Sequence, residues 1–417
     1  MQLLFVISKF ALVTLLVASP AQAREIKKIK EPFKFELITS NIFQWVTGER
    51  SGVVGDEKGK MATRLDGFLA RSQQSVDAAI YGVNKQSWFL DRVGSLANKN
   101  RKIRFVVDQA GGEVNDWTGS NFIYPDTALL PSIIPEEDVK VDIGASGEVR
   151  SSIMHNKFLV VDNRKVWLGS VNISNTEIGS EYNANSVIIV DSKDLAEIYA
   201  SEFKQMFEDN LFSRRKVQNE SPQIAFSDGT HVEVFFSPQD NVKASGVIPF
   251  VQQAKETLNI GMFYLTDKDV IEEIAKAAQE RKVKVRVICD ALAANSSVNG
   301  AFVGYLRKRG VDLRIENWGG KMHMKTAVAD DKNILIGSMN WSASGSQNND
   351  ENTMIIRNNP TLGQSLNRYF DKLWSVIGYQ SSSTKVYAEG HDSINSCFDG
   401  LDNDYDGKVD ADDPGCK

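Results

Sequence analysis

The 417-residue sequence contains only three cysteines and four histidines, and it has no excess of positive charge. Its net charge of −6 lies at the C-terminus, because residues 391–417 hold eight aspartates and two lysines. The rest of the chain is therefore close to neutral. A neutral body argues against the broad basic surface that is typical of nucleic-acid-binding proteins.

Long apolar runs are confined to the N-terminus. A short segment with one charge, residues 1–9, precedes an apolar core at 10–18, and Ala21-Gln22-Ala23 supplies a small-residue cleavage site before Arg24. This pattern predicts a signal peptide over residues 1–23, with an uncleaved anchor as the alternative. No later stretch approaches the roughly 18 apolar residues of a membrane-spanning helix, so we expect an exported, soluble protein, periplasmic or secreted.

The three cysteines divide into a pair and a single residue. Cys397 and Cys416 bracket a loop near the C-terminus, where an exported protein can keep a disulfide. Cys289 ends the apolar run 285–289 and is interpreted as a small residue of a buried strand.

Two stretches that lie 168 residues apart share one pattern of histidine, lysine and aspartate. Each reads His-x-Lys-x4-Asp, and each is followed by Gly-Ser-x-Asn-x-Ser, whose glycine comes 14 residues after the histidine. A single His-x-Lys occurs often by chance, whereas two copies with the same spacing indicate an internal duplication. The paired residues are His155, Lys157, Asp162, Ser170 and Asn172 in the first copy, and His323, Lys325, Asp330, Ser338 and Asn340 in the second.

The sequence around the two motifs repeats as well. Apolar periodicity predicts helix 61–74, strand 75–81, helix 88–97 and strand 102–107, and then helix 250–256, strand 258–264, helix 267–280 and strand 282–289. A strand, a helix and a strand at this spacing form a parallel pair with a right-handed crossover. We therefore expect an α/β fold of two similar halves, each a mixed sheet flanked by helices, packed about a pseudo-two-fold axis with the active site between them.

The twin pattern resembles the HKD signature of the phospholipase D superfamily, over roughly residues 60 to 375. The resemblance implies phosphodiester hydrolysis through a covalent phosphohistidine. It assigns the nucleophile to the N-terminal motif, hence to His155, and makes His323 the general acid and base. Together with the internal repeat, the N-terminal signal and the acidic tail, this predicts the domain order: signal peptide 1–23, N-terminal lead-in 24–59, phospholipase D-like halves 60–215 and 216–390, and acidic tail 391–417.

The residue types suit this chemistry. Side chains alternate along a strand, so the His and Lys of each motif point the same way. The two lysines, with the amides of Asn172 and Asn340, can hold the phosphate oxygens and offset charge in the transition state, so no metal or other catalytic cofactor is expected. Histidine titrates near neutral pH, which fits both imidazole roles. The resemblance gives Asp162 and Asp330 a structural role.

The resemblance further implies a carboxylate that orients a motif histidine. Glu351 fits this place in the second half. In the first half, aligning Asn185 with Asn352 puts Ala184 at the equivalent position, which leaves Glu181 or Asn183 as substitutes.

The acidic tail has the ligand spacing of a calcium loop, with Gly407 at the sharp turn and Asp in place of the usual Glu at position 12. It resembles the short, disulfide-bracketed calcium loops of some exported bacterial proteins. We expect a structural Ca²⁺ there, far from the phosphate chemistry, with a solvated acidic tail as the alternative. Positions 1, 3, 5, 7, 9 and 12 of this loop are Asp402, Asp404, Asp406, Lys408, Asp410 and Asp413.

A phospholipid headgroup ester is the favoured substrate, because both motifs lie on one chain, as in lipid-cleaving members, and the body is not basic. The presence of both motifs on one chain also favours a monomer. The alternative is a metal-independent nuclease with an aromatic, basic groove around Trp117, Trp318 and Arg314. Phosphatidyl transfer of the cardiolipin-synthase kind and a non-catalytic calcium-dependent binding protein rank lower, because the sequence shows no membrane helices and both motifs are complete.

Overall fold

The computed structural model describes residues 24–109, 122, 124–143, 152–219, 221–295, 297–381 and 386–417. The predicted signal peptide lies outside the described residues, as does Trp117. In the described part, no helix is both long and apolar enough to cross a membrane.

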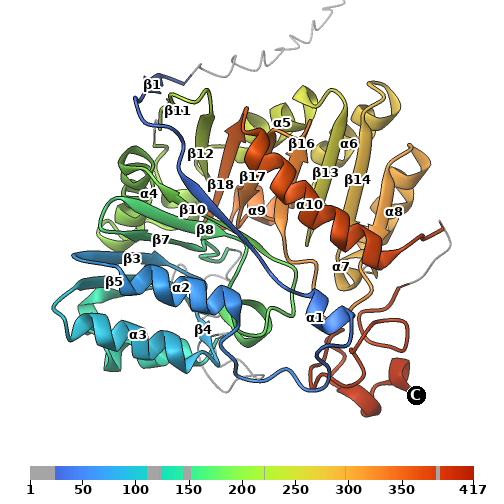
Figure 1. The fold of residues 1–417 in the computed structure, drawn as a ribbon, viewed down its shortest axis with the longest axis horizontal. Helices are drawn as coiled ribbons and strands as arrows, with labels where there is room; N and C mark the ends of the chain where they lie inside the picture. The colour runs from blue at the N-terminus through green and yellow to red at the C-terminus, as the bar shows by residue number, and fades with distance from the viewer. Residues whose placement is uncertain are drawn as a thin grey trace, which may run out of the picture.

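Two mixed sheets form the body of the protein (Figure 1). The first has seven strands, in the order β2 (Phe35–Thr39), β10 (Ser186–Asp191), β8 (Lys165–Gly169), β7 (Phe158–Val161), β3 (Ser75–Ala79), β5 (Lys102–Asp108) and β6 (Val139–Asp142). The second has nine strands, in the order β1 (Ile26–Lys28), β11 (Gln223–Ala225), β12 (His231–Ser237), β18 (Glu351–Arg357), β17 (Asn333–Gly337), β16 (Lys325–Ala329), β13 (Thr257–Met262), β14 (Lys284–Cys289) and β15 (Asp312–Ile315).

The two sheets repeat one topology, which confirms the predicted pair of similar halves. The run β10-β8-β7-β3-β5-β6 of the first sheet corresponds strand for strand to β18-β17-β16-β13-β14-β15 of the second. In each run the last three strands are parallel and the others antiparallel. The predicted strand–helix–strand units are β3–α3–β5 and β13–α6–β14, with α3 at Ser87–Ala97 and α6 at Lys268–Gln279. The lead-in touches both sheets, because β2 pairs with β10 and β1 with β11.

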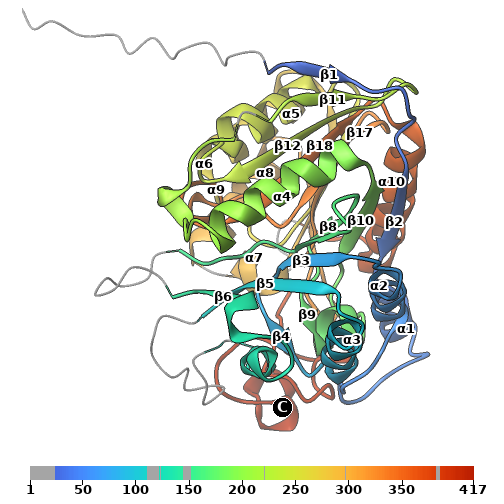
Figure 2. The same cartoon turned by 90° about the vertical axis from the view of Figure 1, so that its left-hand side faces the viewer.

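Helices cover the sheets and close three apolar cores (Figures 1 and 2). One core lies under α2 (Lys60–Ala70) and α3, and one under α5 (Ile248–Gln253), α6 and α8 (Ser297–Lys308). The third joins residues of both sheets with α4 (Lys193–Phe207) and α10 (Pro360–Ile377), so the halves share a buried interface. The short helices are α1 (Phe43–Val46), α7 (Ala291–Asn295) and α9 (Ala343–Gln347), and a two-stranded sheet pairs β4 (Val83–Asn84) with β9 (Ile173–Ser174).

Local sequence explains where the longest helix begins and ends. The Asn359 side chain accepts the backbone N–H of Leu362, and Pro360 occupies the first turn, where no backbone donor is needed. Gly378, with φ of +69°, ends the helix in a conformation that favours glycine. Between these ends, apolar residues at helical spacing, including Leu362, Leu366 and Phe370, are buried.

The C-terminal tail folds back onto the body, at the lower end of both views in Figures 1 and 2. Cys397 and Cys416 form the predicted disulfide, and Cys289 is buried and unpaired, as expected. The Tyr182 hydroxyl donates a hydrogen bond to Asp399 Oδ2 at 2.5 Å. The expectation that the tail lies far from the phosphate chemistry is wrong, because Lys321 Nζ donates to the hydroxyl of Tyr405 only two residues before His323.

Candidate active site

The two HKD motifs begin where the halves exchange backbone hydrogen bonds. The N–H of His155 donates to the carbonyl of Asp350 at 2.9 Å, and the N–H of His323 donates to the carbonyl of Ala184 at 3.0 Å. Each motif histidine is thus fixed by the segment that leads into a strand of the opposite half, β18 or β10. The reciprocal pairing brings both histidines to the junction of the halves.

Both histidine–lysine pairs are buried in the same way. His155 and His323 are 8% and 6% exposed, so a small part of each residue stays open to solvent. Lys157 Nζ donates to the carbonyl of His155 at 2.8 Å, and Lys325 Nζ makes the same bond to the carbonyl of His323. These bonds hold each ammonium group beside its own imidazole.

An aromatic ring packs against each histidine. The ring of Tyr81 lies 5.4 Å from that of His155, and the ring of Phe263 lies 5.2 Å from that of His323. Lys157 Nζ is 5.5 Å from the Tyr81 ring centre and Lys325 Nζ 5.1 Å from that of Phe263, so the rings also stabilise the ammonium groups.

Glu351 of the second half orients His155 of the first. Its Oε1 and Oε2 lie 2.8 and 2.9 Å from His155 Nδ1, and Ser338 Oγ donates to Oε2 at 2.7 Å. Nδ1 therefore carries the hydrogen, which leaves the lone pair on Nε2. A lone pair at Nε2 is what a nucleophilic imidazole requires.

His323 is oriented by a different pair of residues, both from the first half. Its Nδ1 lies 3.2 Å from Glu177 Oε2 and 3.1 Å from Asn185 Oδ1. Asn185 in turn accepts the hydroxyl hydrogen of Ser170 at 2.8 Å, just as Glu351 accepts that of Ser338. Asn185 is therefore the counterpart of Glu351.

The alignment that placed Ala184 opposite Glu351 is wrong by one residue. Gly169 pairs with Val187 in the first sheet and Gly337 with Thr353 in the second, which makes Ala184 the counterpart of Asp350. The residues of β10 and β18 are similarly apolar, so aligning the two sequences could not detect this shift of one residue. Only the hydrogen-bond register of the strands reveals it. The two proposed substitutes lie elsewhere: the Glu181 carboxylate accepts the N–H groups of Asn41 and Met61, and Asn183 Oδ1 accepts that of Lys321.

Glu177 is the member of this site that the sequence pattern did not predict. It lies in the turn Asn175–Gly179, directly after the Gly-Ser-x-Asn-x-Ser segment, and it is 3% exposed. Counting from the two histidines puts Gly345 at the same place in the second half. A Cβ atom at Gly345 would lie 2.3 Å from the carbonyl oxygen of Asn340, so that half has no room for a side chain there. The feature of the sequence that could have pointed to Glu177 is an acidic residue shortly after the Gly-Ser-x-Asn-x-Ser segment.

Asn172 contacts Glu177 through both its side chain and its backbone. Its side-chain Nδ2 donates to Glu177 Oε1 at 2.7 Å, and its backbone N–H donates to Oε2 at 2.6 Å. Asn172 thus positions Glu177 with one of the two hydrogens of its amide group. Asn340 accepts the backbone N–H of Tyr264 at 3.3 Å through Oδ1.

Burial and mutual repulsion set the charges in the site. Burial lowers the pKa of both histidines, that of His323 to about 3, although the carboxylates oppose this effect and the lysines add to it. Burial also lowers the pKa of Lys157 to about 8, and burial together with Lys157 lowers that of Lys325 well below its usual value. The imidazoles are therefore neutral at neutral pH, and the crowded ammonium groups favour an anion.

Asp162 and Asp330 are far from the histidines, at the other end of β7 and β16. The Asp162 carboxylate accepts the backbone N–H groups of Gln73, Gln74 and Ser75. Asp330 accepts those of Lys255, Glu256 and Thr257 in the same manner. The two aspartates thus close the turns that lead into β3 and β13, in keeping with the structural role expected of them.

Comparison with known proteins agrees with this geometry. A family model described as "Cardiolipin synthase, PLD-like domain" matches residues 65–207 and again residues 247–374. The chain belongs to the phospholipase D superfamily. The two matches each contain one HKD motif, so the duplication seen in the sheets is a duplication of the phospholipase D-like domain.

Relatives with curated names act on lipids. The chain is 31% identical over 142 residues to the mitochondrial cardiolipin hydrolase of Mus musculus, covering 33% of this chain and 60% of that protein. It is 22% identical over 170 residues to phospholipase D of Rickettsia prowazekii, covering 41% of this chain and 81% of that protein. The chain therefore spans less than two thirds of the length of the mouse relative.

A solved structure shares the two-half fold. Phosphatidylserine synthase of Haemophilus influenzae aligns with a TM-score of 0.57 at 13% identity, covering 83% of this chain and 88% of that one. This likeness shows that the arrangement of both halves, and not only of one domain, is that of phospholipase D-fold proteins.

The groove expected for a nuclease does not form around Trp318 and Arg314. Trp318 is 2% exposed, and its ring belongs to an apolar cluster with α10. Arg314 lies over the ring of Trp374 at 3.9 Å and donates to the carbonyl of the same residue at 2.8 Å. Both residues are thus engaged in packing.

Proposed function

We propose that this protein is an exported phospholipase D-type hydrolase that cleaves the headgroup phosphodiester of a phospholipid through a phosphohistidine intermediate. The observation that carries the proposal is the reciprocal pairing of His155 with Glu351 and of His323 with Glu177 across the junction of the halves. The lipid-acting names of the relatives support the substrate class. Export depends on the predicted signal peptide.

The first step transfers the phosphatidyl group to the enzyme. The phosphate enters between Lys157 and Lys325, and its charge raises the affinity of His323 for a proton. The Nε2 lone pair of His155 forms a bond to phosphorus while the bond between phosphorus and the headgroup oxygen breaks. His323 Nε2 gives its proton to that oxygen, so the headgroup leaves as an alcohol and not as an alkoxide.

The second step releases the product and restores the site. A water molecule attacks phosphorus and passes one proton to His323, and the nitrogen–phosphorus bond to His155 breaks. The phosphorylated ring of His155 is cationic while Nδ1 keeps its hydrogen, and the fully buried Glu351 stabilises this charge. Both carboxylate oxygens of Glu351 contact Nδ1 of His155, whereas Nδ1 of His323 contacts one oxygen of Glu177 and the amide oxygen of Asn185. The stronger carboxylate contact favours His155 as the nucleophile, because the phosphorylated ring carries a positive charge.

The protein's own ammonium groups supply the positive charge in this scheme. We therefore expect catalysis to need no metal, and the assay that tests the proposal is done in excess chelator. The purified chain is incubated with phosphatidylcholine and cardiolipin vesicles and, in parallel, with single-stranded DNA, beside a His155→Ala control.

Headgroup release that the control lacks is the expected result. Cleavage of DNA without lipid hydrolysis would show that the substrate is a nucleic acid, with the proposed mechanism unchanged. A phosphatidyl alcohol formed when glycerol is added would show transfer in place of hydrolysis. Loss of turnover in chelator, restored by a divalent ion, would overturn the metal-free mechanism.

A further inference from the structure

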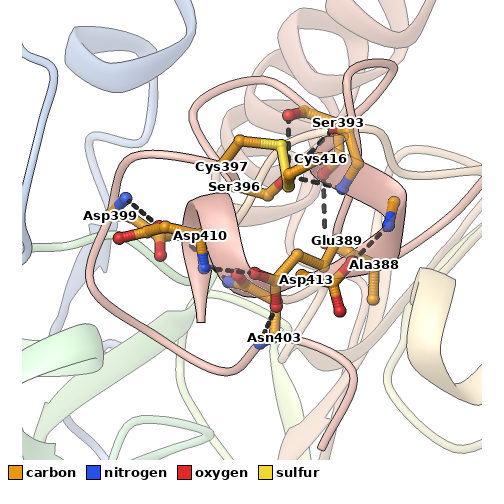
Figure 3. Close-up of a disulfide and its surroundings, with 12 residues drawn as sticks. Ala388, Glu389, Ser393, Ser396, Cys397, Asp399, Asn403, Asp410, Asp413 and Cys416 are labelled. Carbon is orange, nitrogen blue, oxygen red and sulfur yellow. Dashed lines mark hydrogen bonds between the residues drawn. A yellow bond between two sulfur atoms is a disulfide. The ribbon is translucent and has the colours of Figure 1, made fainter. Parts of the chain in front are cut away.

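Acidic side chains of the C-terminal tail lie close together near the disulfide, where Figure 3 shows Glu389 beside Asp413. Carboxylate oxygens of Glu389, Asp402 and Asp404 lie within 4.8 Å of one another, and so do those of Asp404, Asp406 and Asp413. An oxygen of Glu389 also lies within this distance of one from Asp413. Like charges at such spacing repel one another unless a cation lies between them.

Asp413 gives a second, independent indication of a ligand. The residue is 2% exposed, and its Oδ1 accepts the backbone N–H of Gly415 at 2.5 Å. Its Oδ2 is buried and has no hydrogen-bond partner in the described part of the chain. A buried carboxylate oxygen without a partner is costly, and coordination of a metal ion is one of the few ways to offset that cost.

This oxygen set differs from the calcium loop predicted from spacing. The Asp410 carboxylate accepts the backbone N–H groups of Asp399 and Gly400, and Asp410 does not belong to the groups of acidic residues whose oxygens lie within 4.8 Å of one another. Glu389, which lies before the tail, takes its place in the cluster and also accepts the N–H of Asp410. Gly407 has the positive φ, +90°, that the sharp turn requires.

We propose that Glu389, Asp402, Asp404, Asp406 and Asp413 form a binding site for one divalent cation of the Ca²⁺ class. Calcium binds oxygen ligands at about 2.3–2.6 Å, so two oxygens on one ion lie no more than about 5 Å apart. Within each of the two groups of three, the oxygen spacing meets this limit, and Asp404 belongs to both groups. An all-oxygen set with several carboxylates suits Ca²⁺, whereas Zn²⁺ is bound mainly by nitrogen and sulfur.

The position of this site gives the cation a structural consequence. Two residues inside the loop contact the segment that leads to the second HKD motif. Asn403 Nδ2 donates to the carbonyl of Gly319 at 2.7 Å, and Tyr405 accepts a hydrogen bond from Lys321. A cation that fixes Asp402, Asp404 and Asp406 therefore fixes the loop against this segment.

Calcium titration of the purified chain tests the site without any assay of activity. Calorimetry and thermal unfolding are carried out with CaCl₂ after treatment with chelator. The variants are Asp413→Asn, which keeps an oxygen for Gly415, and Asp404→Asn, which removes the exposed carboxylate that belongs to both groups of three. Asp412→Asn is the matched control, because Asp412 is the exposed neighbour of Asp413 and lies outside the cluster.

We expect wild type to bind one Ca²⁺ with a Kd of about 1 mM or tighter and to unfold at a higher temperature with the ion. Asp404→Asn should weaken binding at least tenfold, as should Asp413→Asn if it folds, and Asp412→Asn should change it less than twofold. The proposal is overturned if wild type shows no binding at roughly 10 mM Ca²⁺. It is equally overturned if Asp404→Asn binds as wild type does, which keeps the test decisive should Asp413→Asn not fold.

Discussion

His323 Nδ1 lies 3.2 Å from Glu177 Oε2, although the histidine belongs to one half of the molecule and the carboxylate to the other. His155 is oriented across the same junction by Glu351 at 2.8 Å. Each half therefore supplies the carboxylate for the histidine of its partner half. The site depends on both halves, and the contacts are reciprocal but chemically unequal, because Asn185 stands where symmetry would put a second glutamate.

Glu177→Gln tests this unequal arrangement. The variant should lower kcat about 10- to 100-fold, the cost typical of removing a group that orients a functional histidine. Adding Asn185→Glu should restore at least a tenth of the wild-type kcat, because it places a carboxylate at the position that Glu351 occupies in the other half. Steady-state kinetics of the single and double variants check this expectation.

A matched control for Glu177→Gln is Glu181→Gln, since Glu181 is a nearby buried acid whose carboxylate accepts only backbone N–H groups in the contacts described. This control should lower the melting temperature and leave kcat within about threefold of wild type. A fall in kcat equal to that of Glu177→Gln would mean that any buried acid in this region matters, and a double variant without recovery would contradict the positioning role.

The pH profile of kcat/KM should show no acid limb at the ordinary histidine pKa and should fall on the alkaline side, because rising pH removes both the proton that His323 donates and the charge of Lys157. Because burial lowers the pKa of His155 and lowers that of His323 to about 3, neither imidazole of the free protein should titrate at the ordinary histidine pKa. Lys157, with a pKa of about 8, loses its charge above that pH and with it the attraction for phosphate. An acid limb at the ordinary histidine pKa, or no alkaline fall before pH 10, would contradict these charges.

Lys157→Met should stabilise the fold while abolishing turnover. The folded-state pKa of Lys157 is about 8, below the ordinary 10.5, so the charged form destabilises the folded state at pH 7. This penalty is present below about pH 8 and disappears as the pH rises to the unfolded pKa. We expect the variant to gain on the order of 1–3 kcal/mol of unfolding free energy at pH 7, measured by urea denaturation.

The ligand test for Lys157 uses inorganic phosphate. Phosphate should raise the melting temperature of wild type and have little effect on Lys157→Met, because the anion binds between the ammonium groups. A variant that is less stable than wild type at pH 7 and gains stability from phosphate to the same extent would show that Lys157 is a structural residue.

Asp162→Asn and Asp330→Asn should affect stability and not chemistry. Each aspartate accepts three successive backbone N–H groups, and in Asp162 these bonds lower the pKa despite the opposing effect of burial. Each substitution should cost about 1–3 kcal/mol of unfolding free energy and leave kcat within roughly fivefold of wild type. Since the folded-state pKa of Asp162 is lowered, its contribution should also fade as acid protonates it. A large loss of kcat in a stable variant would place these residues in the catalytic machinery.

Much of this architecture is predictable from the sequence because the duplication repeats local signals. The strands 75–79 and 257–262, and the helices that follow them, begin and end within a few residues of their predicted bounds. The partner of His155 could also be predicted, since Glu351 lies in a recognisable segment. The features that could not be predicted depend on the hydrogen-bond register of the strands and on contacts in which one half supplies a side chain to the histidine of the other. Ala184 and Asn185 differ by one step of the chain, and Glu177 reaches its histidine only because the segment that precedes β10 pairs with the start of the second motif, at Ala184 and Met322.

The most direct test of the account is to trap the covalent intermediate. Wild type is mixed with phosphatidylcholine, and the His323→Ala variant with a phosphatidyl p-nitrophenyl ester, whose leaving group needs no protonation. Both are quenched within milliseconds in base, which preserves phosphohistidine, and digested for mass spectrometry. We expect a phosphatidyl group on the peptide that contains His155, and we expect it to accumulate in His323→Ala. A phosphatidyl group found on His323 instead, or turnover without any adduct on either histidine, would contradict it.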